Sequence, residues 1–243
     1  MGALRHPHRP HRDPRPGRRT PGPGQGVVRG LGGGRPAQRR LPAPRRHRRP
    51  RPAQPRRTAP RPPLTLLPGT PELERYRSSR LVSLRSFEIT VVVDETGEGV
   101  LVSHGDQGGG YSLYVEDGRL HLAYNEYGVL HETDAGPLAP GEHVIVLAAT
   151  AGKGLRWSFT VSVDGEVRAT PPSVHQLIGM APFQGISVGI DRKSPVSWPL
   201  FERHRSFRYT GTLRSVTYTP GAPGPDSPEA VAAALKQAAA AFE

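Results

Sequence analysis

The fold of this chain is decided by residues 111–125, which read Tyr111-Ser112-Leu113-Tyr114-Val115-Glu116-Asp117-Gly118-Arg119-Leu120-His121-Leu122-Ala123-Tyr124-Asn125. An Asp-Gly pair between two runs of alternating apolar and polar residues is the strongest short-range signal of a β-hairpin. A two-residue type I′ turn pairs Glu116 with Arg119, Val115 with Leu120, Leu113 with Leu122 and Tyr111 with Tyr124. One face is then apolar or aromatic. A slip of one residue would turn that face toward water, so the register is well specified.

A second Asp-Gly pair, Asp164-Gly165, predicts a different hairpin. A two-residue loop there would pair Val161 with Arg168, so we expect a three-residue loop over 163–165 with Gly165 in the left-handed conformation. Val161 then faces Val167. Two hairpins that are each apolar on one face cannot bury that face alone, which predicts two antiparallel sheets packed on one another.

The remaining strands are predicted from short apolar runs bounded by Gly and Pro. They cover residues 64–70, 81–84, 87–93, 99–104, 129–133, 143–148, 185–190 and 210–218. Residues 191–209 are expected to be an irregular excursion that carries several aromatic residues, while Trp157, Leu213 and Val216 are predicted to lie in the core. The fold class is therefore all-β, an antiparallel β-sandwich or concanavalin-like jelly roll.

The two ends of the chain differ from this pattern. Residues 1–63 contain 18 Arg and no Lys, Phe, Trp or Tyr, and Asp13 is their one acidic residue, so this segment carries a formal charge of +17 and residues 64–243 carry −5 of the net +12. Such a composition predicts a disordered tail, because it buries too little apolar surface to offset the entropy of ordering. We place the sandwich domain at 64–219, a Pro/Gly-rich linker at 220–226 and an Ala-rich helix at 227–243, which Ser227-Pro228-Glu229 would begin.

Several blocks in residues 64–219 resemble, in order, the carboxy-terminal region of bacterial arylsulfatases. They are LPGT at 67–70, GVLVSHG at 99–105, GGYSLYVEDGRL at 109–120, YN at 124–125, PGEH at 140–143, VDG at 163–165, VGID at 188–191, SPVS at 194–197 and YTGT at 209–212. Each block alone is a generic turn or strand edge. The resemblance implies that the chain is the accessory sandwich of a sulfuric ester hydrolase.

That family's catalytic machinery has no counterpart here. The resemblance implies a formylglycine made from Cys or Ser in C/S-x-P-x-R, and calcium held by carboxylates, both in a separate catalytic domain. This chain has no Cys, and the nearest serine version has Phe201 where Arg is required. No catalytic, cofactor-binding or metal-ligating residue is carried over. We therefore expect a fragment that is inactive alone. Residues 1–63 consist largely of amino acids that G/C-rich codons encode. Our hypothesis is therefore that this segment is a coding sequence translated out of frame.

The residues suggest other chemistry, which stays open at this point. Tyr114, His121 and Trp198 can form a stacking platform for a sugar, as lectin-like sandwiches do, although Tyr114 and His121 also fit a simple cross-strand pair. His104 and Asp106 lie close together on a glycine-rich stretch, which suggests a metal or an acid/base pair, but two residues are a weak signal.

Two functions therefore remain, an arylsulfatase accessory domain and a stand-alone carbohydrate-binding module. The first has as its partner a sulfatase catalytic domain in cis or in trans. The Arg-rich tail would bind nucleic acid only non-specifically, because it has no aromatic residues for base stacking. No signal peptide or membrane-spanning stretch is recognisable, so we expect a cytoplasmic protein without membrane contact.

Overall fold

The computed structural model describes residues 61–179 and 181–229. The predicted tail lies almost entirely outside these residues, and so does most of the Ala-rich helix predicted at 227–243. Within the described part, the elements follow one another along the chain in this order. They are β1 (Leu64–Leu66), α1 (Arg75–Val82), β2 (Arg85–Glu95), β3 (Gly99–Asp106), β4 (Gly109–Glu116), β5 (Arg119–Glu126), β6 (Val129–Pro137), β7 (His143–Gly152), β8 (Arg156–Val163), β9 (Glu166–Ala169), β10 (Val174–His175), β11 (Ile186–Val188), α2 (Trp198–His204) and β12 (Thr212–Pro223).

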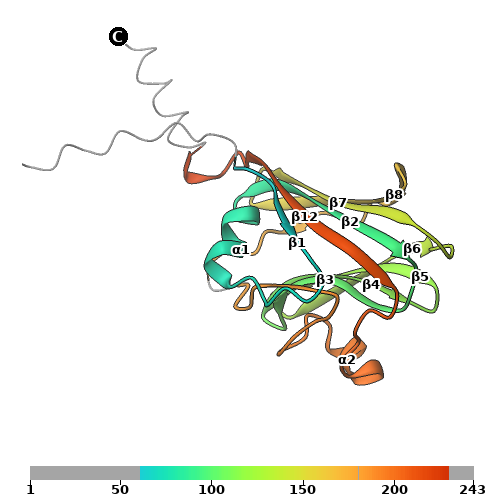
Figure 1. Ribbon diagram of the computed structural model, residues 1–243. Coiled ribbons are helices and arrows are strands. Elements are labelled where there is room, and N and C mark those ends of the chain that lie inside the picture. The colour runs from blue at the N-terminus through green and yellow to red at the C-terminus, as the bar shows by residue number, and fades with distance from the viewer. Residues whose placement is uncertain (1–60, 180, 230–243) are drawn as a thin grey trace, which may run out of the picture. The chain divides into compact units, whose positions relative to one another are not determined.

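The strands form two antiparallel sheets that pack face to face, so the predicted sandwich is confirmed (Figure 1). The larger sheet has the order β1-β12-β2-β7-β8-β10, with β9 paired to β8. The smaller sheet has the order β11-β3-β4-β5-β6. In Figure 1, α1 lies at one end of the two layers, whereas α2 lies on the outer side of the smaller sheet.

The β4–β5 hairpin has the predicted register, with Leu113 opposite Leu122 and Val115 opposite Leu120. Asp117 and Gly118 have φ angles of 52° and 68°, as a type I′ turn requires. The inner face of the hairpin is buried in the main core. Its outer face, which the alternation makes polar, is covered in large part, because Leu200 of α2 packs on it in a second, smaller cluster.

The second hairpin differs from the prediction. β8 and β9 are joined by a two-residue turn, Asp164-Gly165, with Val163 opposite Glu166. Both turn residues have positive φ angles. The register then shifts by one residue, so that Arg168 is bulged and Ala169 comes to face Val161. The bulge places an apolar residue opposite Val161 without the longer loop, which is why the three-residue prediction was wrong.

Residues 81–84 are not a strand, because Leu81 and Val82 end helix α1. The side chain of Glu74 caps this helix by accepting hydrogen bonds from the backbone N–H groups of Tyr76 (2.5 Å) and Arg77 (3.1 Å). Leu81 and Val82 are buried in the main core. A glutamate cap is a weak sequence signal compared with Ser, Thr, Asp or Asn, so the pattern did not reveal the helix.

The 191–209 segment, predicted to be irregular, contains α2. Ser197 caps this helix by accepting a hydrogen bond from the N–H of Leu200 (3.3 Å), and Pro199 lies in its first turn. The last strand, β12, continues to Pro223 and thus into the segment predicted as a linker. Leu213 and Val216 are buried as predicted.

The core between the sheets is centred on aromatic packing. Trp157 is buried, as predicted, and its indole Nε1 donates a hydrogen bond to the carbonyl of Arg85 (2.9 Å). The ring of Phe87 lies edge-on to Trp157 at 5.3 Å and stacks on Tyr111 at 5.9 Å. The partner for the indole N–H explains how so large an amphipathic side chain is accommodated at this depth.

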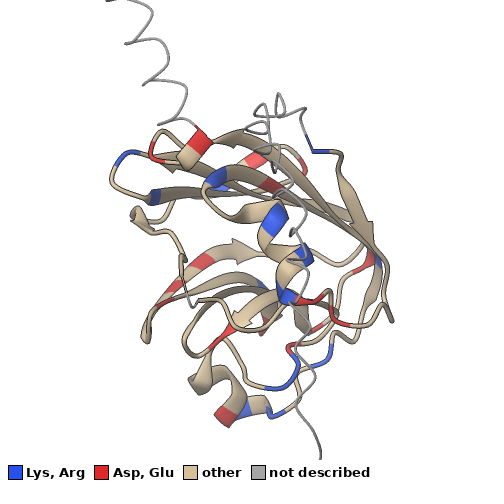
Figure 2. Ribbon diagram, turned by 90° about the vertical axis from the view of Figure 1, so that its left-hand side faces the viewer, with Lys and Arg blue, Asp and Glu red and all other residues tan. Residues whose placement is uncertain are grey.

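Basic and acidic residues are interspersed over the described strands and helices (Figure 2). Neither helix in residues 61–179 and 181–229 has the length and hydropathy that a membrane crossing would need. The cytoplasmic location stays a prediction.

His104 is a polar residue in the core. It is 1% exposed, and its Nδ1 lies 3.3 Å from the hydroxyl of Tyr111. Burial lowers the pKa of His104 to about 3. An unfolded histidine has a pKa of about 6.5, so between these two values the unfolded chain binds more protons than the folded one, and the stability falls as the pH falls.

We expect His104→Phe to reduce this sensitivity to acid. Between pH 6.5 and 5, the wild-type chain should lose up to about 1.4 kcal/mol of unfolding free energy per pH unit from this residue, whereas the variant should not. Urea unfolding of both proteins at several pH values measures the difference. Equal slopes in the two proteins would show that His104 is not buried in the neutral form.

Candidate ligand-binding site

A cleft of about 270 Å³ opens between the inner face of the smaller sheet and the segment before β10. β5 and β6 supply one wall, on which Tyr124 lies opposite His131 and Leu122 opposite Thr133. The complete lining consists of Leu122, Tyr124, His131, Glu132, Thr133, Phe159, Pro171, Pro172, Ser173 and Val174. The cleft therefore combines apolar side chains with a few polar groups, which is the usual composition of a small-molecule site.

Two aromatic rings form part of the cleft wall. The ring centroids of Tyr124 and Phe159 are 5.3 Å apart. The Tyr124 hydroxyl donates a hydrogen bond to the carbonyl of His175 (2.5 Å), which fixes the ring in place. Burial raises the pKa of Tyr124, so this hydroxyl stays protonated and remains a donor.

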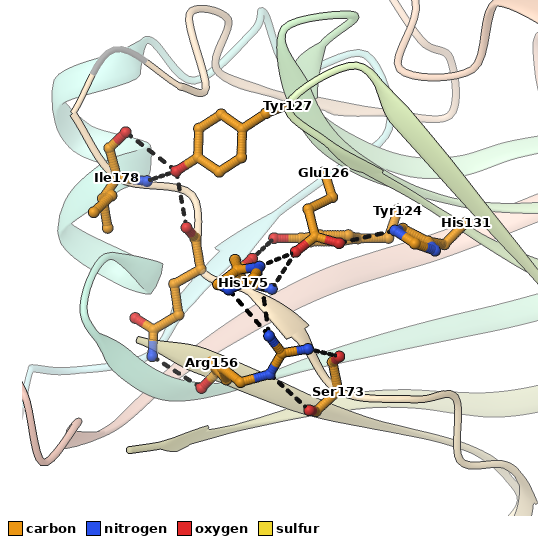
Figure 3. Close-up of polar contacts among 9 residues, drawn as sticks. Tyr124, Glu126, Tyr127, His131, Arg156, Ser173, His175 and Ile178 are labelled. Atoms are coloured by element: carbon orange, nitrogen blue, oxygen red, sulfur yellow. Dashed lines mark hydrogen bonds and ion pairs between the residues drawn. The ribbon is translucent and has the colours of Figure 1, made fainter. Parts of the chain in front are cut away.

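Glu126 connects the two sheets beside this cleft (Figure 3). Its carboxylate lies 2.8 Å from Nε2 of His131, and it accepts a 2.7 Å hydrogen bond from the backbone N–H of His175. The same Oε1 atom lies 2.5 Å from Nδ1 of His175. β5 and β6 belong to the smaller sheet and β10 to the larger one, so one carboxylate holds both layers at this end of the sandwich.

Arg156 joins Ser173 to the imidazole of His175. The guanidinium of Arg156 donates to Ser173 at Oγ (2.9 Å) and at its carbonyl, and one Nη lies 3.1 Å from Nε2 of His175 (Figure 3). The same Nη lies 3.5 Å from Nδ1 of His175, so Arg156 contacts both nitrogens of this imidazole. Ser173 is held by Arg156 and presents a fixed hydroxyl at the rim of the cleft.

The β5–β6 turn is also tied to the loop after β10. The hydroxyl of Tyr127 donates to the carbonyl of Gln176 (2.9 Å) and accepts from the N–H of Ile178 (2.8 Å) (Figure 3). Asn125 accepts from the N–H of Gly128 (2.7 Å) across the same turn. These bonds make the cleft wall a preformed surface, which lowers the entropy lost when a ligand binds.

Opposing effects set the protonation of Glu126. Burial acts to raise its pKa, but the hydrogen bonds from the N–H and imidazole of His175 and from His131 outweigh it. The pKa of Glu126 is therefore held below its ordinary value. Near neutral pH the carboxylate is ionised and accepts all three hydrogen bonds.

None of the three residues predicted to contact a glycan lines this cleft. Tyr114 is 2% exposed, stacks on His121 at 5.1 Å as a cross-strand pair, and donates from its hydroxyl to Glu132 (3.1 Å). Trp198 is 46% exposed at the start of α2, and its Nε1 donates to Glu202 (2.9 Å). Only Trp198 of the three presents an open ring, and the glycan role of all three stays a prediction.

His104 and Asp106, which suggested a metal site or an acid/base pair, are each engaged in contacts within the fold. The carboxylate of Asp106 accepts hydrogen bonds from the backbone N–H groups of Gly108 (2.8 Å), Phe183 (3.1 Å) and Gln184 (3.0 Å). It thereby holds the 181–185 loop against the end of β3. In the part of the chain that the structure describes, no three His, Cys, Asp or Glu side chains are grouped so that they could hold a metal ion.

The cluster of Glu126, His131, Arg156 and His175 was not predicted. Glu126 and His175 are separated by 49 residues, and neither lies in a recognisable motif. One local pattern in the sequence does bear on the cleft. The alternation of side chains along β5 places Leu122 and Tyr124 on the inner face of the sheet, where the cleft opens.

No protein-family model and no curated protein matches this chain. Among solved structures, one of botulinum neurotoxin type C, described for its interaction with two ganglioside molecules, is 6% identical with a TM-score of 0.39, over 65% of this chain and 36% of that chain. The binding domain of botulinum neurotoxin DC in complex with rat synaptotagmin II is 5% identical with a TM-score of 0.40, over 65% of this chain and 36% of that chain. Domains LG4-5 of the mouse laminin alpha1 chain are 12% identical with a TM-score of 0.35, over 65% of this chain and 39% of that chain. This chain thus spans well under half the length of these structures. All three TM-scores lie below 0.5.

We expect Glu126→Gln to lower the free energy of unfolding by about 1–2 kcal/mol at pH 7, because the hydrogen bonds to the carboxylate lose their charge assistance. The folded-state pKa of Glu126 is depressed, so its contribution is present above the unfolded pKa of about 4.3 and is lost as the pH falls through the folded value. The stabilities of the two proteins should therefore converge in acid.

Thermal unfolding from pH 7 to pH 3 measures this convergence. Glu166→Gln, at an exposed position on β9, is the matched control and should change the stability by less than about 0.5 kcal/mol. A constant difference between Glu126→Gln and the wild type across this range would contradict the assignment of an ionised Glu126.

Proposed function

We propose that the sandwich is a carbohydrate-binding module and that the β5–β6 cleft receives one or two sugar units. The observation that carries the proposal is the composition of the cleft, whose wall of aromatic and aliphatic side chains is bordered by hydroxyl and imidazole groups. Sugars present apolar C–H faces together with many hydroxyls, and both surfaces find partners here.

The rigidity of the rim supports the same proposal. Ser173 is fixed by Arg156, and His131 by Glu126, before any ligand arrives. A flexible, strongly hydrated ligand such as an oligosaccharide gains little from each contact, so preorganised partners matter for its affinity. The volume of about 270 Å³ suits a small portion of a chain with its remaining units outside the cleft.

We expect Thr133→Phe to weaken binding of the best ligand from a panel of neutral and sulfated oligosaccharides at least tenfold, because the added ring fills the cleft. Thr150→Phe is the control, since Thr150 is exposed on β7 and does not line the cleft. Titration calorimetry measures both variants. Unchanged affinity in Thr133→Phe would overturn the cleft as the sugar site, and a loss in Trp198→Ala instead would point to the outer face.

The second candidate is the accessory domain of an arylsulfatase, which rests on the sequence resemblance and on one surface. Tyr76 is 81% exposed, Phe183 is 50% exposed and Ile178 is 39% exposed. Tyr76 and Ile178 line a groove of about 420 Å³ between α1 and residues 177–179 and 181–182. An apolar surface of this kind supports docking against a second domain, for which the resemblance suggests a sulfatase catalytic domain.

For this candidate, we expect the chain alone to hydrolyse no sulfate ester and to associate with a bacterial arylsulfatase catalytic domain supplied in trans. The double substitution Tyr76→Ser with Phe183→Ser should weaken that association at least tenfold in a sedimentation or calorimetric assay. Val167→Ser, at an exposed apolar position on β9, is the control. Absence of association in the wild-type chain, together with no C/S-x-P-x-R motif in any frame of the upstream DNA, would remove this candidate.

A further inference from the structure

A further pocket lies outside the smaller sheet, on the face opposite the sugar cleft. Its volume is about 490 Å³. It is bordered by β3 through Val100, by the 190–197 loop, by α2 and by the loop that follows α2. Its lining consists of Val100, Ile190, Asp191, Arg192, Lys193, Pro195, Ser197, Leu200, Phe201, Arg205, Ser206 and Phe207.

The pocket carries three cations above an apolar wall. Arg192, Lys193 and Arg205 reach it from two different loops, while Phe201 and Phe207 contribute aromatic rings. Basic positions are visible on the loops beside α2 at the foot of Figure 2. The sugar cleft differs because no Lys or Arg lines it, and its polar groups are imidazole, hydroxyl and the carboxylate of Glu132.

Two of the three cations form no ion pair in the described part of the chain, although the charge of Arg192 helps to lower the pKa of Glu72. The ammonium group of Lys193 forms an ion pair with Glu72 at 2.6 Å. In contrast, Arg192 forms no ion pair there, and its Nε is buried without a hydrogen-bond partner. Arg205 forms none either, and its guanidinium lies 5.4 Å from the ring centroid of Phe201.

The nearby basic residues of α2, Arg203 and His204, are both paired with a carboxylate. Arg203 donates two hydrogen bonds to Glu116 (2.8 and 2.9 Å), and His204 lies 2.5 Å from the same carboxylate. Arg205, the next residue, forms no ion pair with Glu116 and lines the pocket. It does so with φ 59° and ψ −115°, a conformation that a residue with a side chain rarely adopts. Strain of this kind concentrates at functional positions.

We propose that this pocket binds an organic oxyanion, namely a sulfate, phosphate or carboxylate group attached to a ring, with Arg192 and Arg205 on the anion and Phe201 and Phe207 on the ring. The planar guanidinium matches the paired oxygens of such groups. The apolar wall excludes a bare inorganic ion as the preferred ligand, since that ion would leave the wall in contact with water. The proposal is independent of the sugar cleft.

Asp191 gives the pocket a dependence on pH. This carboxyl group accepts a hydrogen bond from the N–H of Val196 (2.8 Å), and burial together with the charges of Asp106 and Glu72 raises its pKa to about 6, against the opposing hydrogen bonds from Val196 and Ser103. Arg192 and Lys193 line the same pocket. Above pH 6 the ionised carboxylate repels an anion, so binding should weaken as the pH rises through this value.

The experiment uses the full chain with naphthalene-2-sulfonate, the neutral naphthalene-2-sulfonamide of the same shape, and inorganic sulfate. We expect the sulfonate to bind at least tenfold more tightly than either of the other two probes. Arg192→Gln and Arg205→Gln should each weaken its binding at least tenfold. Arg214→Gln is the control, because Arg214 lies on β12 and pairs with Asp94 at 2.5 Å. Thermal unfolding of each variant verifies that it is folded.

The pH dependence separates this pocket from other cationic surfaces. In the wild-type chain, sulfonate affinity should fall severalfold between pH 5 and pH 7.5, whereas in Asp191→Asn it should stay constant. Sulfonate binding that survives both arginine substitutions would place the anion elsewhere, including on the Arg-rich segment 1–63, and would overturn the proposal. Equal binding of the sulfonate and the sulfonamide would overturn it as well.

Discussion

The burial of the inner face of the β4–β5 hairpin against the larger sheet is the interaction on which the rest of the structure depends. Leu113, Val115, Leu120 and Leu122 are almost completely excluded from water. Each such side chain contributes about 1.5–3 kcal/mol of hydrophobic stabilisation. Because side chains alternate along a strand, this register also sends Tyr114 and its neighbours to the outer face. That face is in turn covered by α2, so the same hairpin organises both the main core and the pocket beneath α2.

Carboxylates and amides then hold the loops that the hydrophobic core does not reach. Asp106 binds the 181–185 loop, Glu126 joins the two sheets, and Asp164 accepts from the N–H of Val144 (2.9 Å) to hold the β8–β9 turn on β7. In each case a side-chain acceptor satisfies backbone N–H groups that no strand partner reaches. The charge on the acceptor makes these bonds stronger than those between neutral groups, which suits positions near the rims of binding sites.

The two proposed sites lie on opposite faces of the smaller sheet and use different chemistry. Leu122 and Tyr124 face the inner cleft, whereas Val100 borders the outer pocket. The cleft offers hydroxyl and imidazole groups that are already fixed by neighbours. The pocket offers guanidinium groups that form no ion pair with the described residues. A sandwich can carry both because the two faces of one strand are independent surfaces for side chains.

The sequence by itself determined the β-sandwich class, the register of the central hairpin and much of the core, because these follow from the two-residue period of strands and from one Asp-Gly turn. It misplaced the β8–β9 loop, since the bulge at Arg168 depends on Ala169 finding Val161, and it missed α1, whose cap is Glu74. Only the tertiary structure decided the sites. Glu126 and His175 are in contact although they belong to different sheets, and Arg192 and Arg205 line one pocket from the loops before and after α2. Such juxtapositions depend on packing between distant segments, which leaves no periodic pattern along the chain.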